Sequence, residues 1–313
     1  MQPRRIIIDC DPGQDDAVAL LLACASPAEL EIVGITCVAG NVPLPYTTRN
    51  ALRIGTLAGR TDIPIFAGCP RPMLRRLETA EAVHGTTGLD GVDLPEPAAG
   101  PDPRHAVEFL IEAARASSDK GLTLCPIGPM TNIAMALIMA PEIIPKIREI
   151  VFMGGVALGP GNVTPSAEFN VYVDPHAAKV VLESGIALTM LGLDVTHKAV
   201  ATPARRALIE AVGTPAATAV GQMLTYYDRC DIERYGAPGA PLHDPCVIAY
   251  LLRPELFDGK ACHVEVDVAD GPGLGRTVVD WWGRTKASPN CRVITEIDAD
   301  AFFDLLAERL GKV

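Results

Sequence analysis

The sequence lacks the cysteine pattern of a secreted, disulfide-bonded protein. Its nine cysteines are an odd number, and no two of them form a C-x-x-C pair. Several lie in apolar runs, where cysteine acts as a small hydrophobic side chain. We therefore expect reduced thiols in a cytoplasmic protein and no disulfide framework.

Basic clusters and long apolar runs are also missing. No run of Lys and Arg exceeds two residues, and the formal net charge of the 313-residue chain is -11. Such a chain is not expected to bind a nucleic-acid polymer or an anionic membrane. No apolar run reaches the ~20 residues of a membrane helix. The first residues also lack the apolar segment and cleavage site of a signal peptide.

The sequence has no repeat and no low-complexity tract, and short apolar runs alternate with helical segments. Runs typical of buried strands span residues 5–10, 31–40, 121–128, 149–155 and 186–194. Helical patterns span residues 15–25, 47–59, 104–117 and 132–140. This alternation indicates an α/β fold with a mostly parallel central sheet flanked by helices, whose strands are buried on both faces.

The last third of the chain is less regular. Its patterns predict two helices in 204–236 broken near Gly213, a helix in 244–252, a hairpin in 262–283 and a closing amphipathic helix in 298–310. A Pro-rich stretch over 94–103 is a candidate linker, but the alternation continues beyond it. We expect a single domain over 1–313, with the hairpin and last helices as C-terminal additions.

Polar residues follow the apolar runs and never precede them. Asp9 and Asp11 come after "RIII", Asn41 after "GITCVAG", residues 128–132 after "LTLCPI" and residues 153–155 after "EIVF". In open α/β sheets the ligand crevice lies at the carboxyl ends of the strands. The sequence therefore predicts a functional site at this edge of the sheet.

Four aspartates, Asp9, Asp11, Asp15 and Asp16, lie within eight positions. Asp15 and Asp16 begin a helix, where capping is the ordinary role of an acidic side chain, but capping does not explain four acids. Carboxylates held together in a buried site raise one another's pKa unless a cation compensates them. A hard ion such as Ca²⁺, which binds carboxylates, carbonyls and water, would do so.

Two later features are weaker when taken alone. Asp244 precedes Pro245 at a helix start, which is the ordinary arrangement of a helix cap. Glu168 and Asn170 flank Phe169 with the spacing of a strand, so both side chains could share a face and bind vicinal hydroxyls. The ordinary alternative is a Gly/Pro-rich surface loop.

Together these stretches resemble the nucleoside hydrolases, the family of purine and pyrimidine nucleoside N-ribohydrolases. The motifs, in family order from residue 9 to 245, are "DCDPGQDDAVAL", "GN", "VHGTTGLDG", "IGPMTNIA", "MGG", "GNVTPSAEFNVYVDP" and "PLHDP". The short pieces are not specific one by one, but their order is. The resemblance implies the Rossmann-related fold of that family and cleavage of an N-glycosidic bond by direct attack of a calcium-bound water.

The resemblance also implies a calcium site. Asp11 is similar to the family's metal ligand and general base, Asp16 and Asp244 to further metal ligands, and the carbonyl of Ile127 to a backbone ligand. Asp15 is similar to a ligand of the ribose hydroxyls.

The remaining implied roles concern the nucleoside. Ribose contacts are implied for Asn41, Asn162, Glu168 and Asn170, with Met153 beneath the sugar. Base or leaving-group contacts are implied for His84, His243, Tyr227 and Tyr235. His243 is the candidate acid for the departing base and His84 a candidate base contact, and the sequence leaves open which of them protonates the base.

Overall likeness, including "GLDVTHK" and "GAPLHDPC", favours the bacterial pyrimidine-preferring group, with uridine and cytidine as substrates and inosine also permitted. The family implies a homodimer or homotetramer. Two other hypotheses stay open. One is a haloacid-dehalogenase-like Mg²⁺ phosphatase with Asp9 as nucleophile and Asp11 as acid and base, and the other is a nucleoside-binding protein without catalysis.

Overall fold

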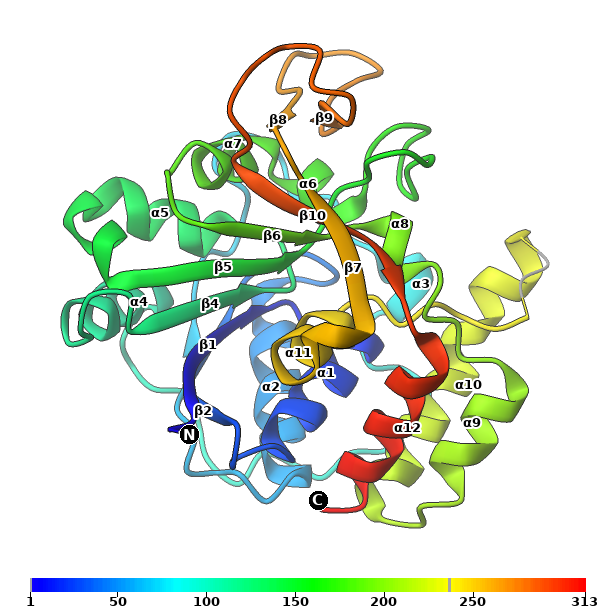
Figure 1. The fold of residues 1–313 in the computed structure, drawn as a ribbon. Helices are drawn as coiled ribbons and strands as arrows, with labels where there is room; N and C mark the ends of the chain where they lie inside the picture. The colour runs from blue at the N-terminus through cyan, green and yellow to red at the C-terminus, as the bar shows by residue number, and fades with distance from the viewer. Residues whose placement is uncertain (1, 236–237) are drawn as a thin grey trace.

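The computed structural model describes residues 2–235 and 238–313, with the backbone alone for 228–235 (Figure 1). The strands are β1 (Arg4–Cys10), β2 (Leu30–Cys37), β3 (Ile65–Ala67), β4 (Leu122–Pro126), β5 (Ile147–Met153), β6 (Leu188–Leu191), β7 (Phe257–Cys262), β8 (Val264–Val266), β9 (Thr277–Val279) and β10 (Cys291–Ile297). The α-helices are α1 (Gln14–Cys24), α2 (Leu44–Leu57), α3 (Glu81–His84), α4 (Ala106–Arg115), α5 (Thr131–Met139), α6 (Phe169–Val173), α7 (Pro175–Leu182), α8 (Leu193–Thr196), α9 (Pro203–Glu210), α10 (Pro215–Tyr235), α11 (Pro245–Leu252) and α12 (Ala299–Leu310). Two 3₁₀ turns, η1 (Pro141–Lys146) and η2 (Pro254–Leu256), complete the set.

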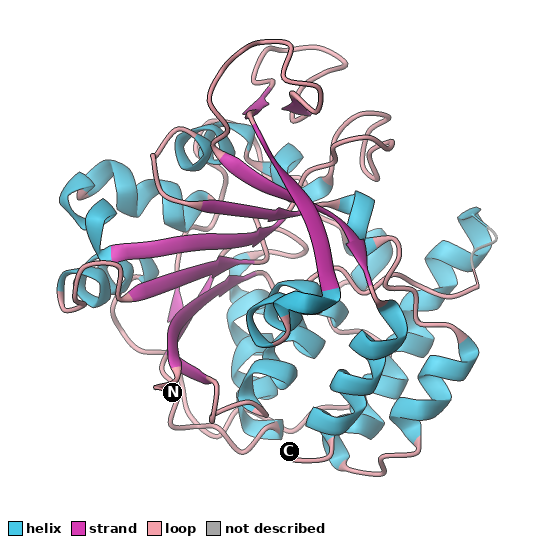
Figure 2. Ribbon diagram, viewed as in Figure 1, coloured by secondary structure: helices cyan, strands magenta, loops and turns pink. Residues whose placement is uncertain are grey.

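Eight strands form one twisted sheet in the order β3-β2-β1-β4-β5-β6-β10-β7 (Figure 2). Neighbouring strands are parallel from β3 to β10, and β7 is antiparallel to β10. The predicted α/β fold with a mostly parallel sheet flanked by helices is therefore confirmed. The predicted hairpin is also present, as the antiparallel pair β8–β9.

The apolar sequence of β1 follows from burial on both faces of the sheet. Ile6 and Ile8 pack in one hydrophobic cluster and Ile7 in the other, as the two-residue period of a strand requires. All three side chains are fully buried, and each such burial is worth about 1.5–3 kcal/mol.

Helices cover both faces of this sheet. On one face α1, buried along its whole length, packs against α2, α10, α11 and α12 (Figure 1). On the other face α4, α5 and α7 contribute to the second hydrophobic cluster. Within the part of the chain that the structure describes, no helix combines the length and apolar character that crossing a bilayer requires.

The strand order reverses direction between β1 and β4. The chain runs from β1 outward to β3, returns to β4 beside β1, and then runs outward the other way to β6. In open α/β sheets the crevice at such a reversal is where ligands bind. The acidic loop after β1 and the carbonyl of Ile127 after β4 lie on its two sides.

The structure corrects the predicted strand geometry around Glu168. Residues 169–173 form the short helix α6, and Glu168 is its N-cap, with its carboxylate accepting from the backbone N–H groups of Asn170 and Val171. Capping satisfies two helix-end donors at once, which an extended segment here would leave open. Glu168 and Asn170 still reach one site, because both belong to the first turn of a helix.

Candidate active site

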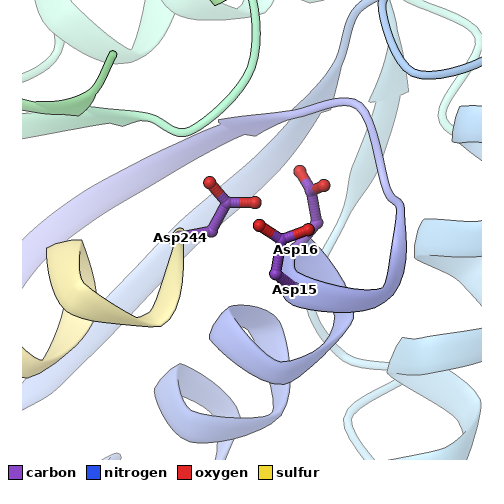
Figure 3. A group of neighbouring side chains, drawn as sticks. All are labelled: Asp15, Asp16 and Asp244. Carbon is purple, nitrogen blue, oxygen red and sulfur yellow. The ribbon is translucent and has the colours of Figure 1, made fainter. Parts of the chain in front are cut away.

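Three aspartates from two helices meet at the carboxyl edge of the sheet. Asp15 and Asp16 come from the first turn of α1, and Asp244 precedes the first turn of α11 (Figure 3). One carboxylate oxygen from each lies within 4.8 Å of the others, and all three residues are buried. The two stretches are more than 220 positions apart in the sequence, so it is the fold that creates this cluster.

Asp16 has a structural role as well as a place in the cluster. Its carboxylate accepts hydrogen bonds from the backbone N–H of Gly13 at 3.0 Å, the backbone N–H of Asp11 at 3.1 Å and Asn41 Nδ2 at 3.2 Å. Asp244 differs, because within the described residues its side chain does not cap its own helix. The capping interpretation therefore holds for Asp16 and fails for Asp244, whose carboxylate faces the other acids.

Asp11 lies next to this cluster in a tight backbone cradle. Its Oδ2 accepts the backbone N–H of Asn41 at 2.6 Å, whereas Oδ1 is buried without a hydrogen-bond partner among the described residues. A Cβ on Gly40 would lie 2.0 Å from Oδ2, and one on Gly128 would lie 2.3 Å from Oδ1. Both positions therefore require glycine for the carboxylate to fit.

Burial raises the pKa of every acid in this group. It raises the pKa of Asp15 to about 8 and that of Asp16 to about 6, with the charge of Asp16 adding to the first shift. The pKa values of Asp11 and Asp244 lie well above the ordinary range, through burial first and the neighbouring carboxylates second. Among the described residues no Lys or Arg forms an ion pair with them.

These observations test whether a metal ion fits. The buried carboxyl groups of Asp15, Asp16 and Asp244 form a set of ligands suited to a hard divalent cation. Asp11, which the motifs predict as a ligand, is not one of these three, but its Oδ1 is buried without a partner in the described chain. The Ile127 carbonyl, the predicted backbone ligand, accepts Asn170 Nδ2 at 2.9 Å and keeps its second lone pair. The donor set therefore fits such an ion.

Asp9 is held apart from the cluster. Its Oδ1 accepts the Thr36 hydroxyl at 2.6 Å and Asn132 Nδ2 at 2.7 Å, and burial raises its pKa to about 7. The side chain is fully buried and does not line the cavity described next. Asp9 thus supports the base of the site from the strand beneath it.

A cavity of about 290 Å³ opens above the acids. Most of the predicted site residues line it: Asp15, Asn41, His84, Ile127, Met153, Asn162, Glu168, Asn170, Tyr227, His243 and Asp244. Asp11 and Asp16 are fully buried beside it. The side chain of Tyr235 lies outside the described residues. The cavity is also lined by residues that sequence reasoning missed: Thr79, Ala80, Ala82, Val83, Val163 and Phe169. In the sequence, only their position close to His84, Asn162 and Glu168 could have indicated that they line the cavity.

The wall formed by α6 and its preceding loop is tied together by hydrogen bonds. Glu168 also accepts the backbone N–H of Gly155 at 2.9 Å, and burial raises its pKa to about 7. Asn170 Nδ2 donates to the carbonyl of Met153 at 3.4 Å in addition to Ile127. Asn162 Oδ1 accepts the backbone N–H of Phe169 at 3.0 Å. The polar groups of this wall are fixed before any ligand binds.

Two histidines face the cavity from other elements. His243 Nδ1 lies 2.7 Å from the Thr196 hydroxyl, and its ring lies 5.5 Å from that of His197. Burial, followed by the two other histidines nearby, holds the pKa of His243 well below its usual value. The ring of His84 stacks on Tyr227 at 5.5 Å, and burial lowers the pKa of His84 to about 4. Both rings are therefore neutral at pH 7.

This fold and this site define a class of protein. The sequence model of the family described as inosine-uridine preferring nucleoside hydrolase matches residues 6–304. The chain belongs to this family, and it is an enzyme of the nucleoside hydrolase class. The resemblance predicted from the motifs is confirmed.

The chain is similar over nearly its whole length to several nucleoside hydrolases. The chain is 48% identical over 308 residues to the pyrimidine-specific ribonucleoside hydrolase RihA of Enterobacter sp. (strain 638), covering 98% of this chain and 97% of the relative. A solved purine-preferring ribonucleoside hydrolase from Gardnerella vaginalis is 32% identical with a TM-score of 0.91, covering 98% of both chains. The plant nucleoside hydrolase PpNRh1 is 30% identical with a TM-score of 0.90, covering 99% of both chains.

Proposed function

We propose that this protein hydrolyses the N-glycosidic bond of pyrimidine ribonucleosides, uridine and cytidine above all and inosine to a lesser degree, releasing free base and ribose. The observation that carries the proposal is the cluster of Asp15, Asp16 and Asp244 at the floor of a cavity of about 290 Å³. The pyrimidine preference is supported by the higher identity to RihA than to the purine-preferring relative.

The cation of this proposal is Ca²⁺. Asp11, Asp16, Asp244 and the carbonyl of Ile127 would hold it, with the unpartnered Oδ1 of Asp11 supporting its place in this set. Asp15 lies with Asp16 and Asp244, close enough to join them or to accept a ribose hydroxyl. When bound, such an ion polarises a water molecule and the sugar diol. The Asp11 carboxylate, with one oxygen anchored on Asn41 and the other without a partner in the described chain, is placed to take a proton from the attacking water.

The sugar carries the positive charge that develops as the bond breaks. Glycoside hydrolysis passes through an oxocarbenium-like state, with charge on C1′ and the ring oxygen. Glu168, Asn170 and Asn162 would orient the ribose above Met153, and their hydrogen bonds to the backbone keep them in place. Fixed positioning of this kind supplies several kcal/mol of barrier reduction.

The leaving base takes the electron pair of the broken bond. His243 is neutral, so it would stabilise the departing base by donating a hydrogen bond. The Thr196 hydroxyl can donate to Nδ1 and thereby leave the proton on Nε2.

The structure gives the phosphatase hypothesis little support. Its nucleophile would be Asp9, whose side chain is fully buried and bonded to Thr36 and Asn132. Among the described residues no Lys or Arg lines the cavity to bind a phosphate.

We also propose that residues 1–313 act as one domain in a cytoplasmic homodimer or homotetramer. The single eight-stranded sheet that includes β10 supports the one domain.

A substrate panel tests the proposal. The protein is incubated with uridine, cytidine, inosine, adenosine and 2′-deoxyuridine, and reducing sugar is assayed with EGTA, with Ca²⁺ and with Mg²⁺. We expect uridine and cytidine to be cleaved fastest, 2′-deoxyuridine at least about tenfold more slowly because one hydrogen-bonded hydroxyl is missing, and EGTA to stop the reaction until Ca²⁺ is restored. A parallel assay of a phosphomonoester is the control. Phosphate release, or uridine cleavage that survives EGTA, would contradict the assignment.

A further inference from the structure

Gln14 is a buried amide whose orientation is fixed by two backbone carbonyls. Its Nε2 donates to the carbonyl of His84 at 3.2 Å and to that of Asp90 at 3.3 Å. A carbonyl can only accept, so the nitrogen of the amide must face them. The other end of the same amide, Oε1, then faces the His84 ring, with Oε1 2.7 Å from Nδ1.

This contact determines which nitrogen of His84 carries the proton. Oε1 can only accept, so Nδ1 must donate and therefore bears hydrogen. The ring is neutral, because burial lowers the pKa of His84. A neutral ring with hydrogen on Nδ1 has a lone pair on Nε2, which is then a hydrogen-bond acceptor.

The remaining edge of the ring is the one available to a ligand. The Nδ1 side lies against Gly13, where an added Cβ would be 2.3 Å from Nδ1. His84 lines the cavity beside Tyr227, and no hydrogen bond of its Nε2 occurs among the described residues.

We propose that Gln14 is a positioning residue that locks His84 in the tautomer protonated on Nδ1, so that His84 Nε2 recognises an N–H donor of the nucleobase and does not protonate it. This inference rests on the proposed function and deepens it. The base of uridine has a single N–H donor, at N3, so an acceptor on His84 can meet only that group. His84 is then a specificity residue, and His243 is left as the histidine that donates a hydrogen bond to the departing base.

Asn50 provides a matched control for the structural role of Gln14, which is to tie two chain segments together through hydrogen bonds. Its Nδ2 donates to the carbonyls of Pro12 at 3.0 Å and Thr87 at 2.8 Å, so it ties together the same two chain segments without touching His84. Gln14→Met and Asn50→Leu each remove a buried amide of similar size. An effect of loop anchoring alone would appear in both variants.

The first experiment is independent of catalysis. Long-range ¹H–¹⁵N NMR spectra of the full chain labelled with ¹⁵N-histidine report which ring nitrogen is protonated, and His84→Gln identifies the His84 signals among the six histidines. We expect hydrogen on Nδ1 at pH 7 in the wild type and in Asn50→Leu, and loss of that signature in Gln14→Met. Hydrogen on Nε2 in the wild type, or an unchanged pattern in Gln14→Met, would overturn the proposal.

The second experiment measures recognition of the base. In Gln14→Met we expect kcat/KM for uridine to fall about tenfold, the effect of one mispaired hydrogen bond, mostly through KM. For 3-methyluridine, which lacks the N3–H, the same substitution should change kcat/KM by less than about twofold, since the donor is already missing. Equal losses on both substrates, or the same pattern in Asn50→Leu, would refute base recognition through Gln14. If uridine is not cleaved at all, the proposed function fails while the NMR result still decides the tautomer.

Discussion

A buried carboxyl group costs free energy unless a hydrogen bond or a cation compensates it, and Asp11 shows this balance most clearly. One of its oxygens is held by the backbone N–H of Asn41, and the other has no partner among the described residues. The chain also keeps glycine at Gly40 and Gly128, so that this carboxylate fits. The arrangement buries a carboxyl group that is only partly compensated, which lowers the stability of the fold when no cation is bound.

The substitution Asp11→Asn tests separately how this carboxylate affects activity and how it affects the stability of the fold. We expect kcat for uridine to fall about 10³-fold, because the proposed general base is lost. We expect the free energy of unfolding at pH 7 in EGTA to rise, since a neutral amide of the same shape replaces an acid whose pKa is raised by burial. Steady-state kinetics and urea unfolding measure the two effects, and Asp304→Asn on the exposed face of α12 is the control. Undiminished turnover would remove Asp11 from the reaction.

The sequence identified these residues but not all of their contacts. Acids after an apolar run were enough to predict that a candidate site lies at this edge, because parallel strands bring their carboxyl ends together there. That Asp244 joins Asp15 and Asp16 within 4.8 Å depends on how α11 packs against α1, which no local pattern contains. Gln14 and Thr196 were missed for the same reason, since their partners His84 and His243 lie 70 and 47 positions away.

Among the elements, the β8–β9 hairpin supports the wall of the site. The Thr277 hydroxyl on β9 donates to the carbonyl of Val156 at 2.6 Å and accepts its backbone N–H at 2.8 Å. Ser166 donates to the Pro272 carbonyl in the hairpin turn at 3.0 Å. The loop between these two contacts carries Asn162, so the hairpin projecting from β7 in Figure 1 holds a proposed ribose contact in place.

Thr277→Val tests this support. The substitution leaves the backbone N–H and carbonyl of Val156 unpaired in a buried position, which costs about 1–3 kcal/mol. We expect KM for uridine to rise about tenfold with little change in kcat, since positioning of the sugar is lost before chemistry. Val278→Thr, a substitution of the half-exposed neighbour on the same strand, should leave both constants unchanged. Equal kinetics in the two variants would show that the hairpin is not needed by the site.

The elements that were predicted and those that were missed differ in burial. β1, β4 and β5 are near-continuous apolar runs because helices cover both of their faces, and this made them visible in the sequence. β3 has only three residues, and β7 at the edge of the sheet has only its first and last residues buried. β10 alternates buried and exposed residues at its start and is only partly buried toward its end. Such strands carry little hydrophobic signal, so only the folded sheet reveals them.

Across the whole molecule, several acidic side chains are buried, where ionising a carboxyl group costs the most free energy. The chain carries a formal net charge of -11, and its acids include a buried group with raised pKa values: Asp9, Asp11, Asp15, Asp16, Glu168 and Asp244. A carboxyl group whose pKa is raised by folding binds its proton more tightly in the folded state. Its contribution to stability is complete below the unfolded pKa near 4 and is lost as pH rises through the folded pKa.

The metal-free protein should therefore become less stable as pH rises. The folded pKa values of Asp16, Asp9 and Asp15 are about 6, 7 and 8, so the loss in EGTA should extend from about pH 4 to pH 8. Saturating Ca²⁺ favours the ionised carboxylates, and at about 100 times Kd it should raise Tm at pH 8 by about 5 °C. At pH 5 protons compete for the same oxygens, so the increase should be much smaller. Calorimetry at both pH values, with Mg²⁺ as the control ion, measures this. A Tm at pH 8 that Ca²⁺ leaves unchanged would mean that the converging aspartates do not form a calcium site.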